Sequence, residues 1–211
     1  MDAVNQGWVC MPANATLGGV TSAQNRGLRA IRELGELTAA LEHSWTIIDE
    51  LASWTSGLIV GGARLLACGN GGSAAEAQHF ATELLGRYQV ERAPLAAVAL
   101  GADGSLLTCL LNDYPPDAIF ARQVAGLGRP GDLLVGLSTS GRSRNISVAI
   151  TTARHKGLHT LALLGKGGGD TKGLAEREWI VPSGTTARIQ EAHLLFIHLV
   201  CDYIDAALVR T

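Results

Sequence analysis

The chain has few cysteines, no apolar run long enough to span a bilayer, and almost no net charge. Its four cysteines are scattered over 211 residues without a Cys-x-x-Cys spacing, which indicates neither a zinc knuckle nor a disulfide framework. A formal net charge of −2 argues against a nucleic-acid-binding surface. The missing apolar span argues against a membrane protein. We therefore expect no nucleic-acid partner and no membrane association.

Two further absences concern signals with a fixed pattern. The first twenty residues lack the basic start and apolar run of a signal peptide, which favours a cytoplasmic protein. No Gly-Lys-Ser or Gly-Lys-Thr follows a glycine-rich loop, which argues against a P-loop. Gly69, Gly71 and Ala74 match the weak form of a dinucleotide fingerprint, with Asp103 as the ribose acid. That fingerprint leaves the polar residues described below unexplained, so we expect no nucleotide cofactor.

Apolar segments and helix-like patterns alternate from Arg64 onward. Hydrophobic residues make up 47% of the chain and glycines number 26, a composition that suits buried parallel strands joined by tight turns. We expect an α/β fold with a doubly wound, five-stranded parallel sheet of the flavodoxin-like kind. The expected strands are 65–68, 95–100, 133–137, 160–164 and 179–181. The expected helices are 74–85, 105–111, 117–127, 143–156, 171–176 and 187–208.

The part of the chain before the sheet is expected to form a helical arm. Residues 1–20 are rich in small residues without periodicity, and we interpret them as a loose tail. Apolar residues then recur every three or four positions through 21–60, as is typical of amphipathic helices. The simplest division is a tail, 1–20, and one domain, 21–211, that includes the arm. One apolar stripe has no obvious partner in the sheet and predicts contacts between subunits, with packing on the chain's own sheet as the alternative: Leu28, Ile31, Leu34, Leu41, Trp45 and Ile48.

Two polar loops follow buried strands. Residues 68–73 read Cys-Gly-Asn-Gly-Gly-Ser, and residues 138–143 read Ser-Thr-Ser-Gly-Arg-Ser. In a parallel sheet both loops lie at the carboxyl edge of the strands, where ligands bind. Glycines let the backbone approach a ligand, and the free N–H groups of a helix start attract anions. With four hydroxyl groups in the second loop, the pattern predicts a site for a phosphorylated small molecule.

The helices after these loops carry candidate chemical groups. His79 and Glu83 stand four residues apart and share a helix face, where such a pair can bind a metal or move a proton. An isolated pair is more often an ordinary surface pair, but its place after a ligand loop favours a site. On the last helix, His193 and His198 do not share a face, so we expect at most one at the site. Gln190 stands about 12 Å along the axis from His198.

Six segments together resemble the phosphoheptose isomerases of the sugar isomerase (SIS) domain superfamily, from about residue 30 to residue 208. They are CGNGGS at 68–73, QHFATEL at 78–84, GRY at 86–88, ND at 112–113, STSGRS at 138–143 and RIQEAH at 188–193. A single motif would be modest evidence, whereas six in order are specific. The resemblance implies a homotetramer with active sites between subunits. It also implies the interconversion of D-sedoheptulose 7-phosphate and D-glycero-D-manno-heptose 7-phosphate through an enediol.

The resemblance carries specific roles to residues of this chain. Glu83 and His198 would be the acid/base pair, with either one serving the carbon proton. One zinc ion per subunit would be held by His79, Glu83, Gln190 and His198. Asn112 and Asp113, which alone would be interpreted as turn caps, would line the sugar. The full set expected to bind the sugar phosphate is Asn70, Gly71, Gly72, Ser73, Glu83, Asn112, Asp113, Ser138, Thr139, Ser140, Ser143 and Gln190.

Alternatives remain open at this stage. Ala187 stands where relatives often carry an aspartate, so one sugar hydroxyl loses a partner. Segments 74–81 and 201–205 are similar to a non-catalytic branch whose tetramers bind a bacterial replication initiator protein. That branch lacks the acid at position 83 and the histidine at position 198, and this chain has both, which favours the enzyme. An isomerase of another phosphosugar is a further alternative.

Overall fold

The structure, a computed structural model, describes residues 18–209, with side chains from residue 25 onward. Residues 1–17 of the expected tail lie outside the described residues. Residues 18–20 begin helix α1 (Gly18–His43), so the expectation of a loose segment is wrong there. Each residue added to a helix gains one hydrogen bond, and no proline interrupts this segment.

The chain divides into two compact units, with the boundary after Glu36 inside α1. In the first unit, Arg29 and Glu33 form an exposed ion pair of 3.3 Å one helical turn apart. The second unit contains the end of α1, helix α2 (Trp45–Val60) and the whole sheet. Ser44 separates the two helices, and its hydroxyl donates to the carbonyl of Ala40. The apolar periodicity of the arm therefore belongs to two successive helices.

The second unit is built around a five-stranded parallel sheet, as the sequence predicts. Its strands are β1 (Leu65–Gly69), β2 (Ala97–Ala99), β3 (Leu133–Ser138), β4 (His159–Leu164) and β5 (Arg177–Ile180). The order across the sheet is β2-β1-β3-β4-β5, with every neighbouring pair parallel. The chain passes from β2 to the far side of β1, so the order reverses between β1 and β3. Such a switch point opens a crevice at the carboxyl ends of the strands.

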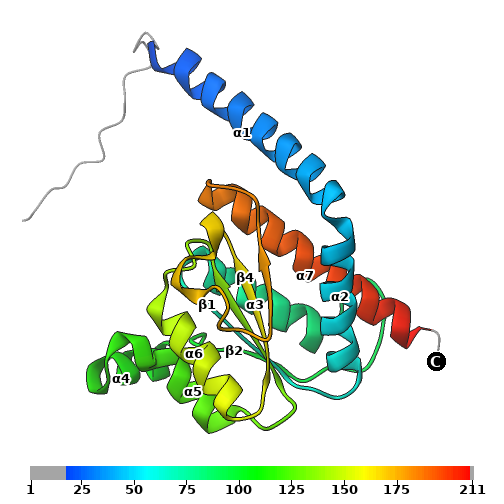
Figure 1. Cartoon of the computed structure of the whole chain (residues 1–211), viewed down its shortest axis with the longest axis vertical. Coiled ribbons are helices and arrows are strands. Elements are labelled where there is room, and N and C mark those ends of the chain that lie inside the picture. Colours follow the sequence, from blue (N-terminus) through cyan, green and yellow to red (C-terminus); the bar gives the residue numbers. More distant parts are fainter. Residues whose placement is uncertain (1–17, 210–211) are drawn as a thin grey trace, which may run out of the picture. The chain divides into compact units, whose positions relative to one another are not determined.

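Helices cover both faces of the sheet (Figure 1). The helices that follow α2 are α3 (Gly72–Leu85), α4 (Gly104–Asp113), α5 (Ile119–Leu127), α6 (Arg144–His155) and α7 (Thr186–Leu208), with 3₁₀ helices η1 (Pro116–Ala118) and η2 (Lys166–Thr171). One core cluster joins α2, α3 and α7 to one face, and a second joins α4, α5 and α6 to the other. Alternate strand residues face opposite sides, so Leu65 and Ala67 enter the first core while Leu66 and Cys68 enter the second. None of the described helices is long and apolar enough to cross a membrane.

Two expectations from the sequence are wrong in detail. Thr171 is the last residue of η2, and residues 172–176 form turns rather than a helix. Backbone N–H groups in this segment bond to side chains. Gly173 donates to Glu178 at 2.7 Å and Glu176 donates to Thr160 at 2.8 Å. The apolar stripe is also not uniformly free for other subunits. Leu41 and Ile48 are buried in the first core, whereas Leu28, Ile31 and Trp45 are exposed.

Candidate active site

The two polar loops lie side by side at the switch point. Gly69, the last residue of β1, pairs in register with Leu137 near the end of β3. Asn70 and Asn145 then exchange two hydrogen bonds between their side-chain amides, each 2.9 Å long. This edge of the sheet therefore combines the glycine-rich turn, the hydroxyl-rich turn and the starts of α3 and α6.

The hydroxyl-rich loop is folded tightly around Gly141. The Ser138 hydroxyl donates to the Ser143 hydroxyl at 3.0 Å, and the Arg142 amide donates to the Ser140 hydroxyl at 3.2 Å. Gly141 has a φ of +63°, and a Cβ there would lie 2.0 Å from the carbonyl oxygen of Gly168. Ser143 is the N-cap residue of α6, so the positive end of that helix faces the loop. Hydroxyls and free amides at a helix start are suited to phosphate oxygens.

Gln190 of α7 lies against the glycine-rich loop. A Cβ on Gly72 would meet the side-chain nitrogen of Gln190 at 2.2 Å, so only glycine permits this approach. Ser73, the next residue, is buried at the start of α3. The structure therefore brings Gln190 to Gly72 and Ser73 at the start of α3, although Gln190 is far from both in sequence.

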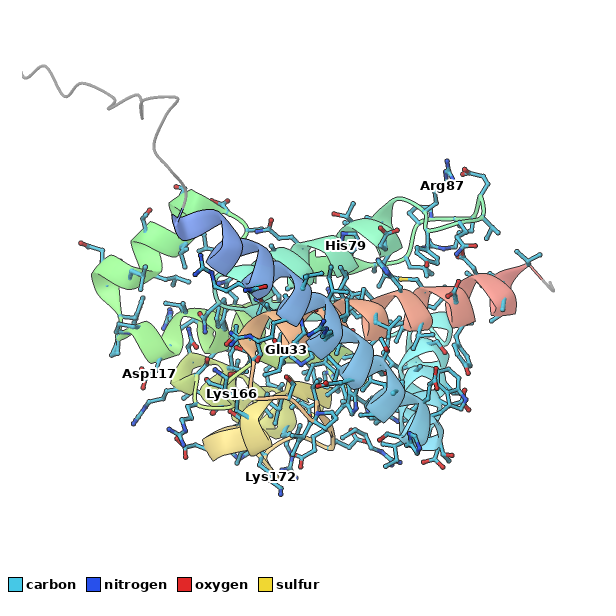
Figure 2. All side chains as sticks on the ribbon, turned by 90° about the horizontal axis from the view of Figure 1, so that it is seen from above. Glu33, His79, Arg87, Asp117, Lys166 and Lys172 are labelled. Atoms are coloured by element: carbon cyan, nitrogen blue, oxygen red, sulfur yellow. The ribbon has the colours of Figure 1, made fainter. Side chains whose placement is uncertain are left out.

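Two histidines and a glutamate form a polar cluster where α3 faces α7. Nε2 of His79 lies 3.2 Å from the Glu83 carboxylate and 3.1 Å from Nε2 of His198. Figure 2 shows His79 on α3 with α7 running alongside. The ring of Tyr88 stacks on the His198 imidazole, with centroids 5.5 Å apart and planes inclined by 25°. One proton between the two Nε2 atoms makes one imidazole a donor and the other an acceptor, which is an arrangement suited to proton transfer.

His193 is excluded from this cluster, as the five-residue spacing from His198 requires. It is fully buried, and its Nε2 lies 3.2 Å from the carbonyl oxygen of Leu164. Burial lowers its pKa to about 4, while the hydrogen bond to the Leu164 carbonyl acts in the opposite direction. His193 is therefore a neutral core residue that packs near Trp179.

Asn112 and Asp113 are not joined to the histidine cluster. They end α4, which packs on the other face of the sheet, and their side chains hydrogen-bond each other at 2.8 Å. Both are exposed. Their assignment to the sugar site stays a prediction. Arg87 also points outward after α3, where it lies 3.7 Å from Glu91 (Figure 2).

Glu76 is a buried acid that the sequence analysis did not single out. Only 9% of the residue is exposed, and Oε2 has no hydrogen-bond partner among the described residues. Burial raises the pKa of its carboxyl to about 7, although a hydrogen bond with Ser73 works in the opposite direction. The three-residue spacing between Ser73 and Glu76 was the available signal, since such residues are neighbours on a helix.

The cluster has the donor types that zinc prefers, namely two imidazole nitrogens and a carboxylate. In their present positions, however, the described histidine, cysteine, aspartate and glutamate residues form no group of three that could hold a metal ion. The Nε2 atoms of His79 and His198 bond to each other instead. Zinc at His79, Glu83, Gln190 and His198 therefore stays a prediction.

Comparison with known proteins agrees with this fold. The SIS domain family matches residues 30–165. The phosphoheptose isomerase of Geobacter sulfurreducens is 48% identical over 184 residues, which cover 86% of this chain and 95% of that protein. The chain belongs to the phosphoheptose isomerases. A second member of the family, from Shewanella denitrificans, is 50% identical over 164 residues, 76% of this chain and 84% of the relative.

Solved structures of phosphoheptose isomerases share the architecture. The enzyme from Neisseria gonorrhoeae is 41% identical, with a TM-score of 0.79 over 87% of this chain and 99% of that one. The enzyme from Francisella tularensis is 34% identical, with a TM-score of 0.83 over 87% and 98% of the two chains. The family resemblance and the α/β fold expected from the sequence are therefore confirmed.

Proposed function

We propose that this phosphoheptose isomerase interconverts D-sedoheptulose 7-phosphate and D-glycero-D-manno-heptose 7-phosphate, with Glu83 and His198 as its acid/base pair. The observation that carries the proposal is that Glu83 of α3 and His198 of α7 each lie within 3.2 Å of the His79 ring. The relatives named above support the substrate class. Family membership at 48% identity over most of the chain supports an enzyme rather than a binding module.

The reaction requires two proton movements. In the ketose-to-aldose direction, C1 loses a proton to a base, an enediol forms between C1 and C2, and C2 takes up a proton. The hydroxyl proton of O1 must leave as O2 gains one. We assign the exchange of the carbon proton to Glu83 and that of the oxygen proton to His198. His79 contacts both side chains and can orient them. The opposite division of roles between Glu83 and His198 uses the same geometry.

The phosphate group would be held by the hydroxyl-rich loop. Ser138, Ser140 and Ser143 face the positive end of α6, and Ser73 lies at the start of α3. Thr139, Asn70 and the glycines at 71 and 72 complete the two loops. Binding of the phosphate group far from the reacting carbons fixes the sugar relative to Glu83 and His198. Because the substrate is a charged metabolite that does not cross bilayers, we also propose that the enzyme acts in the cytoplasm.

A homotetramer with sites between subunits is the assembly that we propose. The second unit contains a cavity of about 220 Å³, lined by Leu41, Trp45, Ile48, Trp179, Leu195, Phe196 and their neighbours. Trp45 and Leu195 are 46% and 43% exposed at this cavity. An apolar surface of this kind beside α7 suits a helical interface between copies of the chain.

A substrate panel tests the proposed activity. The purified chain is incubated with sedoheptulose 7-phosphate and, separately, with other ketose phosphates, and the aldose products are followed by NMR. Turnover of sedoheptulose 7-phosphate is expected. Turnover of a different ketose phosphate alone would identify another phosphosugar isomerase. No turnover, with or without added zinc, together with binding to a replication initiator protein, would instead identify a binding module.

A further inference from the structure

The loop between α3 and β2 is fastened to the end of α7 by one carboxylate. Asp205 accepts hydrogen bonds from the backbone amides of Gln89 at 3.0 Å and Val90 at 3.2 Å. It also pairs with Arg92 at 3.3 Å, and the two side chains are only 8% and 4% exposed. A buried carboxylate with three donors is held firmly, because each lost donor would leave part of its charge uncompensated.

Arg92 extends this fastening to the helix that carries Glu83. Its guanidinium donates to the backbone carbonyl of Glu83 at 2.7 Å and to that of Leu84 at 2.9 Å. These carbonyls belong to the last turn of α3, where no further helical N–H group is available to them. A cation at this end also matches the helix dipole. The backbone position of Glu83 is therefore tied to Asp205 through one side chain.

The fastened loop places Tyr88 on the catalytic histidine. Tyr88 immediately precedes the two amides that Asp205 binds, and its ring stacks on His198. His198 and Asp205 are seven residues apart on α7, which places them on nearly the same helix face about 10 Å apart along the axis. The face of α7 that carries His198 is thus also the face that holds the loop, and the loop returns to cover the imidazole.

We propose that Tyr88 is a positioning residue for the proposed isomerase reaction, with its ring holding the His198 imidazole toward His79 and Glu83. The inference rests on the proposed roles of Glu83 and His198. An aromatic ring stacked on one side of an imidazole limits rotation about its side-chain torsions, and small misplacements of a reacting group can lower a rate about 100-fold. The phenolic hydroxyl has no part in this role.

Tyr88 provides a cleaner test than Asp205 or Arg92, since removing one partner of a buried ion pair destabilises the fold itself. Tyr88→Phe keeps the ring, and Tyr88→Leu removes it while keeping apolar bulk. Tyr114→Leu is the matched control, because Tyr114 packs under Arg122 away from the cluster. Each variant is assayed for kcat and KM on sedoheptulose 7-phosphate, and its histidine ring nitrogens are examined by ¹⁵N NMR.

We expect Tyr88→Phe and Tyr114→Leu to keep kcat within about twofold, and Tyr88→Leu to lower it about 10- to 100-fold with little change in KM. The ¹⁵N signals of the His79 and His198 rings, compared in metal-free protein, should change only in Tyr88→Leu. Wild-type kcat and unchanged histidine signals in Tyr88→Leu would overturn the proposal, as would equal losses in Tyr88→Phe and Tyr88→Leu. If the wild-type chain turned over no substrate, the proposed function would fail, but the NMR comparison would still test the positioning role.

Discussion

The Nε2 atoms of His79 and His198 lie 3.1 Å apart although 119 residues separate them in the chain. One histidine comes from α3, which follows the glycine-rich loop, and the other from α7 at the end of the fold. Because His79 also contacts Glu83, their contact brings this acid and the last helix into one cluster.

The hydroxyl-rich loop should control substrate affinity. Ser138→Ala removes a donor that we assign to the phosphate, so KM for sedoheptulose 7-phosphate should rise about 10-fold or more while kcat changes less. Thr151→Ala is the matched control, because its exposed hydroxyl bonds only within α6. Steady-state kinetics check this result. Equal KM values for Ser138→Ala and the wild type would remove the loop from phosphate binding.

Zinc content tests the predicted metal ligands directly. Purified protein dialysed against zinc should retain about one ion per chain by elemental analysis. His79→Ala should lose most of it, because one of the few imidazole ligands is gone, whereas the exposed His155→Ala should retain it. The same zinc content in His79→Ala and the wild type would show that the metal, if retained, is bound elsewhere.

Glu76 should give the stability of the fold a distinct pH dependence. Burial raises its pKa in the folded chain to about 7, above the ordinary value of 4.5, so the folded state binds a proton more tightly than the unfolded state. The stability that this tighter proton binding gives the folded state is fully present below about pH 4.5 and is lost as pH rises toward 7. Glu76→Gln removes the titration. The variant should therefore gain stability relative to the wild type between about pH 5 and pH 8.

Urea unfolding of both proteins at the two pH values and at one protein concentration measures this difference. If the free energies of unfolding of Glu76→Gln and the wild type differed by the same amount at both pH values, Glu76 would titrate normally in the folded chain.

Assembly can be tested at the apolar cavity of the second unit. Trp45→Glu combined with Leu195→Glu places two charges on its exposed rim, which should dissociate a tetramer. Light scattering should give four times the 22.0 kDa chain mass for the wild type and a smaller mass for the variant. Leu127→Glu, equally exposed on α5, is the control and should leave the mass unchanged. A fully active wild-type monomer would contradict the proposed assembly.

The fold was largely predictable because its strands are buried on both faces. Continuous apolar segments such as 133–137 allow few alternatives in an α/β chain, and all five expected strands are present. The break at Ser44 was not predictable, since apolar periodicity continues on both sides of it. The sequence also did not show which residues of the apolar stripe are buried and which are exposed. Spacing alone does not reveal which residues, such as Leu41, a chain buries against its own sheet.

In the candidate site, contacts between residues close in sequence were predictable, whereas contacts between distant residues were not. The four-residue spacing of His79 and Glu83 predicts their contact from helix geometry. No spacing predicts the contact of His79 with His198, and only the family resemblance connected them. Asp205 was missed because its partners, the amides of Gln89 and Val90 and the side chain of Arg92, depend on tertiary packing.

Whether Glu83 and His198 are the acid/base pair is tested by comparing wild type, Glu83→Gln and His198→Gln in a single NMR time course with sedoheptulose 7-phosphate. Both substitutions keep size and polarity while removing a proton-transfer group, so rates should fall about 100-fold or more with substrate binding retained. Thermal unfolding of the three proteins confirms that the variants are folded. We expect aldose formation by the wild type and almost none by either variant. Wild-type rates in either variant would contradict the role assigned to that residue.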